Sequence, residues 1–394
     1  MTTNRTATRR RLVAAGVLAS MIPLAACGGE ASEGADGPVE IVGLIEVKGD
    51  SEFALDDYDN GAQLAVDMVN SEGGVLGEDL SYERIPASVV DPQQARTAFL
   101  KAVDRNPSAI FGFPGGGSLE ALTREVDRAG VPMIHISSDG KLAFGAEAGS
   151  EWLFSINPDD RGRTDTAVTY AQELGAQTVG IIATDETFGR ESTDKTLPAL
   201  EEAGLDVGAV RYVSPTATDL TSAVLDMQDV DVIISWTFPN ILALQLEQMA
   251  QNELQLPVIT GNSGPLVVAN ELATGPAIDQ LYAATPCAPS IGESAIGQEF
   301  AKAYQAEYGV QPTASATQVY DTVRVLARAI EEAGTTDHDA VQEALSDLEM
   351  DDGACASLYR TDEAHFLGHQ YVVVDFSANG SSKIVETYDV PEAK

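Results

Sequence analysis

The sequence is poor in basic residues, histidine, cysteine and tryptophan. Its 394 residues include 23 Lys and Arg against 61 Asp and Glu, which gives a formal net charge of −38, and only 4 His, 3 Cys and 2 Trp. A surface this acidic repels nucleic acid and anionic membranes, so we expect no nucleic-acid partner. The few Cys and His residues form no cluster with the spacing of zinc ligands, and we expect no metal site.

The motifs of several enzyme classes are also missing. The sequence has no Gly-x-x-x-x-Gly-Lys-Ser/Thr phosphate loop, and no dinucleotide fingerprint follows its first expected strand. The segment Gly261-Asn262-Ser263-Gly264-Pro265 departs from the nucleophile elbow of serine hydrolases, because proline stands where glycine is needed. We therefore expect a protein that catalyses no reaction and needs no cofactor. A serine hydrolase, which would need a histidine near Ser118 or Ser263, stays as the alternative.

Long apolar runs are absent as well. No stretch of about 20 apolar residues occurs, so no transmembrane helix is expected. The apolar run 12–24 follows Arg9-Arg10-Arg11 and is too short to span a bilayer. A basic start, a short apolar core and small residues together predict that 1–27 is an export signal.

The end of this signal resembles the bacterial lipobox, in which cleavage precedes a cysteine whose thiol is then lipidated. The residues are Leu24-Ala25-Ala26-Cys27-Gly28. We expect Cys27 to anchor the exported protein to the outer face of the cell membrane, with 28–38 as a flexible tether. The segment Thr8-Arg9-Arg10-Arg11-Leu12-Val13 also resembles a twin-arginine signal, so the export route stays open.

Short apolar runs alternate with amphipathic stretches along the rest of the chain. Strands are expected at 39–45 and 80–87, and helices at 60–70 and 93–104. Such alternation predicts right-handed βαβ units around a parallel sheet. An interruption at 154–158 precedes a second set of strands and helices. The length of the chain predicts two domains, and its 44% hydrophobic content allows two real cores.

The second set of elements has the same pattern as the first. Strands are expected at 178–183, 207–213, 230–235, 257–261 and 281–284, with helices at 161–174, 189–203, 220–227 and 240–252 between them. Helices then dominate at 299–308, 316–332 and 339–348, and strands at 368–376 and 383–388 close the chain.

The stretch 109–139 carries the main candidate site of the first domain. A buried strand leads into the turn 114–117, after which Ser118 stands where a helix is expected to begin. Ligands of open parallel sheets bind outside the carboxyl ends of the strands, and unpaired N–H groups at a helix start suit a carboxylate. An ordinary capped turn is the alternative. The candidate residues are Gly116, Gly117, Ser118 and, after the next strand, Ser137, Ser138 and Asp139.

Several local phrases, taken in their order along the chain, resemble one family. They are Asn60-Gly61-Ala62-Gln63-Leu64-Ala65-Val66-Asp67, Asn70-Ser71-Glu72-Gly73-Gly74-Val75-Leu76-Gly77, Gly130-Val131-Pro132-Met133-Ile134, Phe188-Gly189-Arg190, Tyr308-Gly309-Val310-Gln311-Pro312 and Val319-Tyr320-Asp321. The chain resembles the type I periplasmic binding proteins, in particular the leucine/isoleucine/valine-binding branch. The resemblance covers about 39–388. It implies an α/β fold of two Rossmann-like lobes, joined by a three-segment hinge and closing over a ligand.

The resemblance also implies the domain boundaries and the function. Chain crossings are expected near Asn157, Pro286 and Gly353. Lobe 1 is then 39–156 plus 288–352, and lobe 2 is 157–287 plus 353–394. The implied protein is a monomeric solute-binding lipoprotein of an ABC importer, which captures a small polar ligand and presents it to a membrane permease. A ligand-sensing receptor for signalling would use the same closure and stays open.

The resemblance implies further site residues, most of them aromatic. Phe188 takes the place of a family tyrosine, Trp236 and Phe238 follow a strand end in lobe 2, and Phe53 adds a wall from the first loop. Packing of these rings into the core is the alternative.

The turn that contains Ser263 lacks the acid that pairs the ligand's ammonium in the amino-acid receptors of this family. The matching residues are Gly261-Asn262-Ser263-Gly264. An unpaired buried ammonium is costly, so Asp139 or Asp185 substitutes for the missing acid, or else the ligand is an amide or a carboxylate rather than an amino acid.

Two cysteines remain after lipidation, Cys287 and Cys355. The implied topology puts both on adjacent hinge segments, and exported chains favour disulfides, so we expect them to be bonded. Two separate thiols are the alternative. His135 is expected in the core. His365 and His369 have helical spacing, but the glycine and strand pattern around them argues against a metal site.

Overall fold

The computed structural model describes residues 38–46, 55–88, 91–112, 116–288, 294–355, 358–376 and 382–390. The predictions for the signal peptide, for Cys27 and for Phe53 lie outside these residues. Within them, no helix is long and apolar enough to cross a membrane.

The first large sheet is entirely parallel. Its strands are β1 (Val39–Glu46), β2 (Leu80–Ala87), β3 (Ala109–Gly112), β4 (Met133–His135) and β5 (Leu153–Ser155), in the order β2-β1-β3-β4-β5. Strand β3 is buried along its whole length, as expected for a strand covered on both faces. The first domain therefore has its strand ends at one edge, as the alternation of elements predicts.

Helices cover both faces of this sheet. On β1, Val39 and Ile41 pack with one core and Val42 and Leu44 with the other, because successive side chains of a strand point to opposite faces. The first core is shared with α1 (Leu55–Ser71), α10 (Ala295–Tyr308), α11 (Ala314–Ala333) and α12 (His338–Ser346). The second core is shared with α2 (Pro92–Val103), α3 (Gly116–Glu120) and α4 (Thr123–Ala129).

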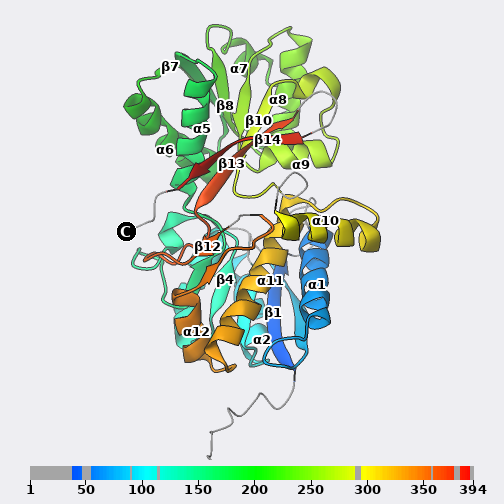
Figure 1. The fold of residues 1–394 in the computed structure, drawn as a ribbon. Helices are drawn as coiled ribbons and strands as arrows, with labels where there is room; N and C mark the ends of the chain where they lie inside the picture. Colours follow the sequence, from blue (N-terminus) through cyan, green and yellow to red (C-terminus); the bar gives the residue numbers. More distant parts are fainter. Residues whose placement is uncertain are drawn as a thin grey trace, which may run out of the picture. The chain divides into compact units, whose positions relative to one another are not determined.

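Helices α1 and α11 lie side by side over one face (Figure 1). Gly61 makes their close approach possible, because a Cβ there would collide with the carbonyl of Ala316. The helical segment 314–333, far along the chain, thus belongs to the first lobe.

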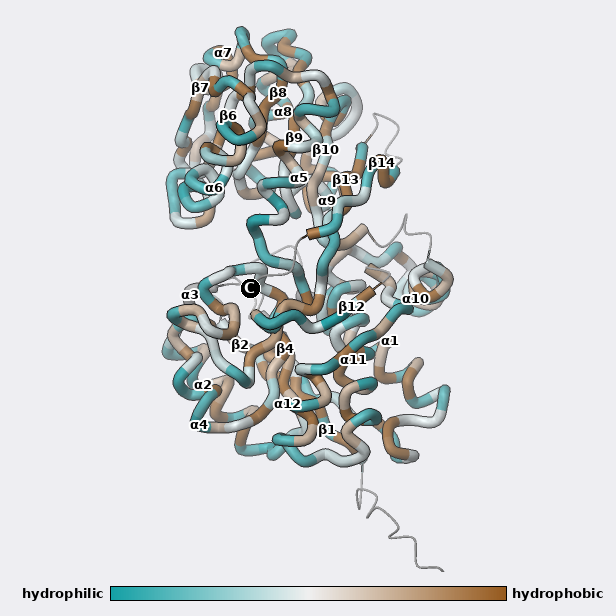
Figure 2. Tube along the Cα trace, turned by 60° about the vertical axis from the view of Figure 1, so that its left-hand side comes forward, coloured by the Kyte–Doolittle hydropathy of each residue, from teal (hydrophilic) through white to brown (hydrophobic). Residues whose placement is uncertain are grey.

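The second large sheet has a parallel centre and an antiparallel end. Its order is β14-β13-β10-β9-β8-β6-β7, where β13 pairs antiparallel with both β10 and β14. The strands are β6 (Thr178–Thr184), β7 (Asp206–Val213), β8 (Val232–Trp236), β9 (Val258–Thr260), β10 (Leu281–Thr285), β13 (Gln370–Phe376) and β14 (Ser382–Asp389). The helices packed around it are α5 (Asp160–Glu173), α6 (Thr187–Ala203), α7 (Thr221–Leu225), α8 (Pro239–Gln251) and α9 (Ser263–Ala269), with the 3₁₀ turn η2 (Gly275–Ile278). Hydrophobic residues mark the strands β8 to β10 in Figure 2.

The third crossing between the sheets lies later in the chain than predicted. Residues after 353 still pack on the first lobe, where β11 (Glu349–Met350) pairs with β12 (Tyr359–Arg360). Phe366 then pairs with Ser155, and the chain enters the second sheet only at β13. The crossing predicted near Gly353 is therefore wrong and lies near Gly368. A Cβ at Gly368 would come within 2.7 Å of the Ile156 carbonyl, so the first and third crossings pass closely.

A buried carboxylate, that of Asp321, holds the segment before this crossing. It accepts hydrogen bonds from the amides of Ala354 (2.8 Å) and Cys355 (2.7 Å) and from the Tyr359 hydroxyl (2.7 Å). The predicted bond between Cys287 and Cys355 is present, with their Cα atoms 4.5 Å apart, so the same segment is tied to the second crossing. Burial raises the pKa of Asp321 to about 6, although the three donors and Arg324 oppose the shift.

Replacing Asp321 by Asn should remove a pH dependence of stability. A folded-state pKa above the unfolded value means that the folded protein binds the proton more tightly, so this group's contribution to stability falls as pH rises from about 4 to about 6. The free energy of unfolding of the wild type, measured relative to Asp321→Asn by urea denaturation, should therefore decrease by on the order of 3 kcal/mol across that range. If the unfolding free energies of the two proteins changed in parallel with pH, the raised pKa of Asp321 would be contradicted.

Candidate functional site

The carboxyl edge of the second sheet brings an arginine against two aromatic rings. The Arg163 Cζ atom on α5 lies 5.2 Å from the ring centroid of Phe188, which begins α6, and 5.2 Å from that of Trp236, which ends β8. Its Nη2 atom is 3.3 Å from Ser192 Oγ, and within the described part of the chain its buried Nε atom has no hydrogen-bond partner. The guanidinium of Arg163 is thus positioned by α5, α6 and β8, which begin or end at the carboxyl edge of the second sheet.

The local sequence fixes Phe188 at this edge. Glu186 caps α6 by accepting hydrogen bonds from the amides of Phe188 (2.9 Å) and Gly189 (2.9 Å), and it accepts another from the Thr184 hydroxyl. A Cβ at Gly189 would collide with the Thr184 carbonyl. The Phe188 ring stacks on the ring of Phe238, with centroids 6.1 Å apart, and Phe238 is 38% exposed.

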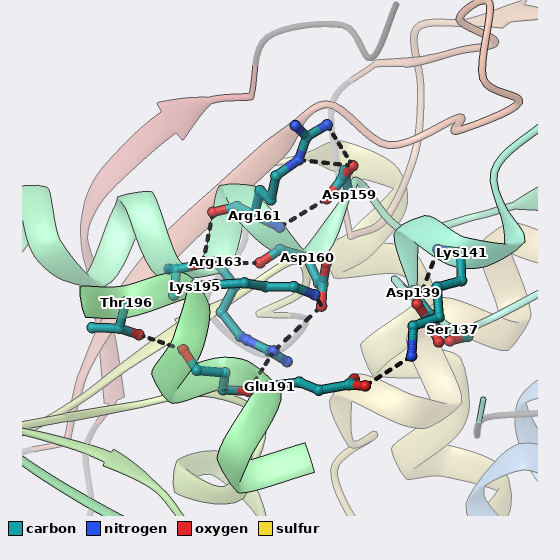
Figure 3. A network of polar contacts seen from close by, with 12 residues as sticks. Ser137, Asp139, Lys141, Asp159, Asp160, Arg161, Arg163, Glu191, Lys195 and Thr196 are labelled. Atoms are coloured by element: carbon teal, nitrogen blue, oxygen red, sulfur yellow. Dashed lines mark hydrogen bonds and ion pairs between the residues drawn. The ribbon is translucent and has the colours of Figure 1, made fainter. Parts of the chain in front are cut away.

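A network of charges surrounds Arg163, and Figure 3 shows Arg163 and Lys195 converging on Asp160. Asp160 Oδ2 lies 3.9 Å from Arg163 Nη2 and 2.5 Å from Lys195 Nζ, whereas its Oδ1 is buried without a partner. Burial raises the pKa of Asp160, and the two cations oppose that shift. Arg163 and Lys195 thus share the carboxylate of Asp160, and Asp159, the preceding residue, adds a second carboxylate nearby.

At the first sheet, the structure places Ser118 in a short helix rather than at the start of a long one. The helix expected to begin at Ser118 starts two residues earlier, at Gly116, and α4 follows α3 after a short break. Ser118 is 2% exposed, and its hydroxyl has no hydrogen-bond partner among the residues that the structure describes. Gly116 and Gly117 form the first turn of α3. An unpaired buried hydroxyl at a strand's carboxyl end is an open position for a ligand oxygen.

The next turn satisfies most of its polar groups internally. Ser137 Oγ accepts from the Asp139 amide (3.3 Å), and Asp139 in turn caps the 3₁₀ turn η1 (Gly140–Leu142) by accepting from the Lys141 amide (3.0 Å). The capped turn that the sequence analysis left as an alternative is therefore present, with Asp139 as the cap residue and Ser137 bound to its amide. His135 is buried as predicted, and burial lowers its pKa to about 4.

Direct contacts join the strand ends of the two sheets. The amide of Asp160 donates to the Ser138 carbonyl (2.9 Å), and Lys141 Nζ lies 2.7 Å from Glu191 Oε1 on α6 (Figure 3). Asn157, at the first crossing, donates to the Ile136 carbonyl (2.8 Å). The turn after β4 and the start of α5 and α6 are therefore neighbours.

Three predicted residues of the second sheet have different surroundings from one another. Trp236 is fully buried, and its indole N–H donates to Thr196 Oγ1 (2.8 Å), which favours the alternative of core packing. Its role in ligand binding stays a prediction. Phe238 remains partly exposed. Ser263 donates to the Thr237 carbonyl (2.7 Å) and begins α9.

Sequence reasoning missed Arg163 and Lys195. The available signal was the scarcity of basic residues, because two of the few cations lie on adjacent helices: Arg163 in the first turn of α5 and Lys195 in the middle of α6. Within the described residues no group of three or more His, Cys, Asp or Glu side chains could hold a metal ion.

Comparisons with known proteins agree on one family and one fold. A family profile described as "Periplasmic binding protein" matches residues 38–381. Among named relatives, "Leu/Ile/Val-binding protein homolog 8" of Brucella melitensis is 25% identical over 338 residues, which cover 82% of this chain and 83% of the relative.

Two solved structures with the same fold were found at lower identity. The branched-chain amino acid transporter substrate binding protein LivJ of Streptococcus pneumoniae, in complex with isoleucine, has a TM-score of 0.76 at 21% identity and covers 88% of this chain and 99% of its own. A solute binding protein of an ABC transporter from R. palustris, in complex with benzoate, has a TM-score of 0.76 at 15% identity, covering 91% and 98%. These likenesses confirm the predicted fold of two Rossmann-like lobes.

Alanine substitutions at Trp236 and Phe238 should lower the free energy of unfolding by different amounts, because one ring is in the core and the other is partly exposed. Trp236→Ala removes a fully buried ring and should lower the free energy of unfolding by about 3–5 kcal/mol, measured by urea denaturation without ligand. Phe238→Ala is the matched control and should lower it by less than about 1 kcal/mol, since the ring is partly exposed. Equal losses would contradict the placement of Trp236 in the core.

Proposed function

This chain belongs to the periplasmic binding protein family, and we propose that it is the solute-capturing subunit of an ABC importer. It acts outside the cytoplasm as a monomer, anchored to the membrane through lipidated Cys27. It binds a small carboxylate at the carboxyl edges of its two sheets and presents it to the permease.

The observation that carries this proposal is the unpaired hydroxyl of Ser118. A buried hydroxyl without a hydrogen bond is unfavourable, so a ligand that supplies the acceptor gains both the bond and relief of that penalty. Isoleucine and benzoate, the ligands of the two structural relatives, share a carboxylate. Ser137, Ser138, Asp139 and the backbone of Gly116 and Gly117 complete this side of the proposed site, and Phe188 and Phe238 form the apolar side.

The site is proposed to bind without catalysis. A serine hydrolase would need a histidine base on Ser118 or Ser263. Ser263 donates to a backbone carbonyl and Ser118 has no partner, so in the described part of the chain neither hydroxyl is paired with an imidazole. Neutral His135 has its Nδ1 atom occupied by the Ser137 amide (3.3 Å).

The ligand class is tested by a thermal-shift screen of amino acids, amides, short carboxylates and polyamines, because a true ligand raises the melting temperature by mass action. We expect hits only among compounds that carry a carboxylate. Stabilisation by none of the four classes would contradict the proposed function.

Ser118→Ala should weaken binding of the hit by about tenfold, since a hydrogen bond to a charged group is lost. It should leave the unfolding free energy without ligand unchanged or higher, because the deleted hydroxyl has no partner. Ser155→Ala is the control: its hydroxyl contacts the carbonyls of Ser137 (2.6 Å) and Asn157 (3.0 Å), and its loss should cost about 1 kcal/mol of stability. A Ser118→Ala protein with unchanged affinity would exclude Ser118 from the site.

Lipid anchoring is tested separately. Replacing Cys27 by Ala should release the protein from the membrane fraction and abolish incorporation of a labelled fatty acid. Membrane association that persists in the Cys27→Ala protein would contradict the anchor.

A further inference from the structure

We propose that Arg163 is the specificity-determining residue of the second lobe, and that the ligand is an organic anion with an apolar body and no α-ammonium group. The inference rests on the proposed function and names its ligand class. It comes from the unused hydrogen-bonding capacity of one buried guanidinium and from the charges and rings that surround it.

Arg163 has more donors than its neighbours satisfy. A guanidinium carries five N–H donors, and the side chain of Arg163 is only 13% exposed. Its Nη2 atom has a long contact with Ser192 (3.3 Å) and lies 3.9 Å from Asp160, which is too far for a hydrogen bond, and its Nε atom has no partner. A carboxylate accepts two parallel N–H bonds from a guanidinium, so a ligand carboxylate would supply the missing acceptors.

The surroundings hold this guanidinium in place for a ligand. The Phe188 and Trp236 rings both lie within cation–π distance of its Cζ atom. A Cβ at Gly261 would come within 3.1 Å of the Arg163 Cδ atom, so the absence of a side chain there leaves room for the arginine. The Phe188 ring continues into the partly exposed ring of Phe238, which provides an apolar surface beside the charge.

Three acidic side chains of α5 and α6 have partners, although the Oδ1 atom of Asp160 has none among the described residues. Asp160 contacts Lys195, Glu191 contacts Lys141, and Glu186 accepts two amide hydrogen bonds at the start of α6. An ammonium group placed near Arg163 would meet the repulsion of Lys195 and would compete with these pairs for a carboxylate. The charges of this edge therefore favour a ligand that brings one negative charge and no positive charge.

The test uses three variants and two probes of nearly equal shape. Benzoate and benzamide differ in the carboxylate, and calorimetry measures the affinity of each variant for both. Arg163→Gln should weaken benzoate binding by about tenfold to a hundredfold and leave benzamide binding unchanged. Arg163→Lys keeps the charge but loses the paired N–H geometry, and should recover part of the benzoate affinity.

Arg161→Gln is the matched control, because it removes the same charge from the same helix. Arg161 is 68% exposed and pairs with Asp159, so its loss should leave both affinities unchanged. The ratio of the two affinities is compared within one variant, so partial unfolding, which would weaken both probes together, cannot imitate a selective loss.

The inference and the proposed function fail in different ways. An unchanged benzoate affinity in Arg163→Gln overturns the role of Arg163 and leaves the proposed function intact. Tighter binding of isoleucine than of benzoate or hexanoate to the wild type overturns the ligand class only. Failure of every one of these compounds to bind overturns both.

Discussion

The buried carboxylate of Asp321 is the constraint on which the arrangement of the chain crossings depends. Two backbone amides and a tyrosine hydroxyl point at it, so the segment around Ala354 and Cys355 has one place to lie against α11. The disulfide then fixes the second crossing to the same segment. Because the last two strands reach the second sheet only after this segment, the 382–390 end of the described chain is positioned by a carboxylate in the first lobe.

Parallel topology explains why polar groups gather where they do. In both sheets the strands that carry the site end at one edge, so residues far apart in sequence follow neighbouring strands. At the first sheet this edge carries the hydroxyl of Ser118, which has no partner among the described residues. At the second sheet it carries the guanidinium of Arg163, which is only partly hydrogen-bonded and lies over aromatic rings. In the proposed site these edges supply two kinds of donor to one anion: a neutral hydroxyl from the first sheet and a charged guanidinium from the second.

Sequence periodicity could predict most strands, because a buried parallel strand is a short apolar run such as Ala109–Gly112. Strand β5 was missed because it runs directly into Asn157 and Pro158, so the segment was interpreted as an interruption between the two sets of elements. The third crossing was misplaced because Asp321 fixes it through contacts with residues more than thirty positions away. Ser118 could be selected because a glycine turn marks its position. Arg163 could not, because its role depends on rings from β8 and α6.

Trp236 shows why the face of a fully buried strand cannot be read from sequence. Strand β8 is buried at all its positions, so alternation gives no signal about which side chain meets a ligand and which meets the core. The residue was expected to enclose the ligand, and the structure shows its ring buried with the guanidinium of Arg163 5.2 Å from its centroid. In the proposed site this ring would act through the cation that lies over it.

The strong negative charge of the chain bears on how such a site could work. A formal charge of −38 repels an approaching anion at long range, but salt screens charges beyond about 10 Å at roughly 0.1 M ionic strength. Within that distance the nearby charges determine the electrostatic energy of a bound anion. Here the cations Arg163 and Lys195 lie beside the carboxylate of Asp160. Arg163 is also little exposed, so its interaction with a ligand is screened less than that of the surface acids. Selectivity for an anion is therefore compatible with an acidic surface, because affinity is set within a few ångströms of the guanidinium and the overall charge acts mainly on the rate of encounter.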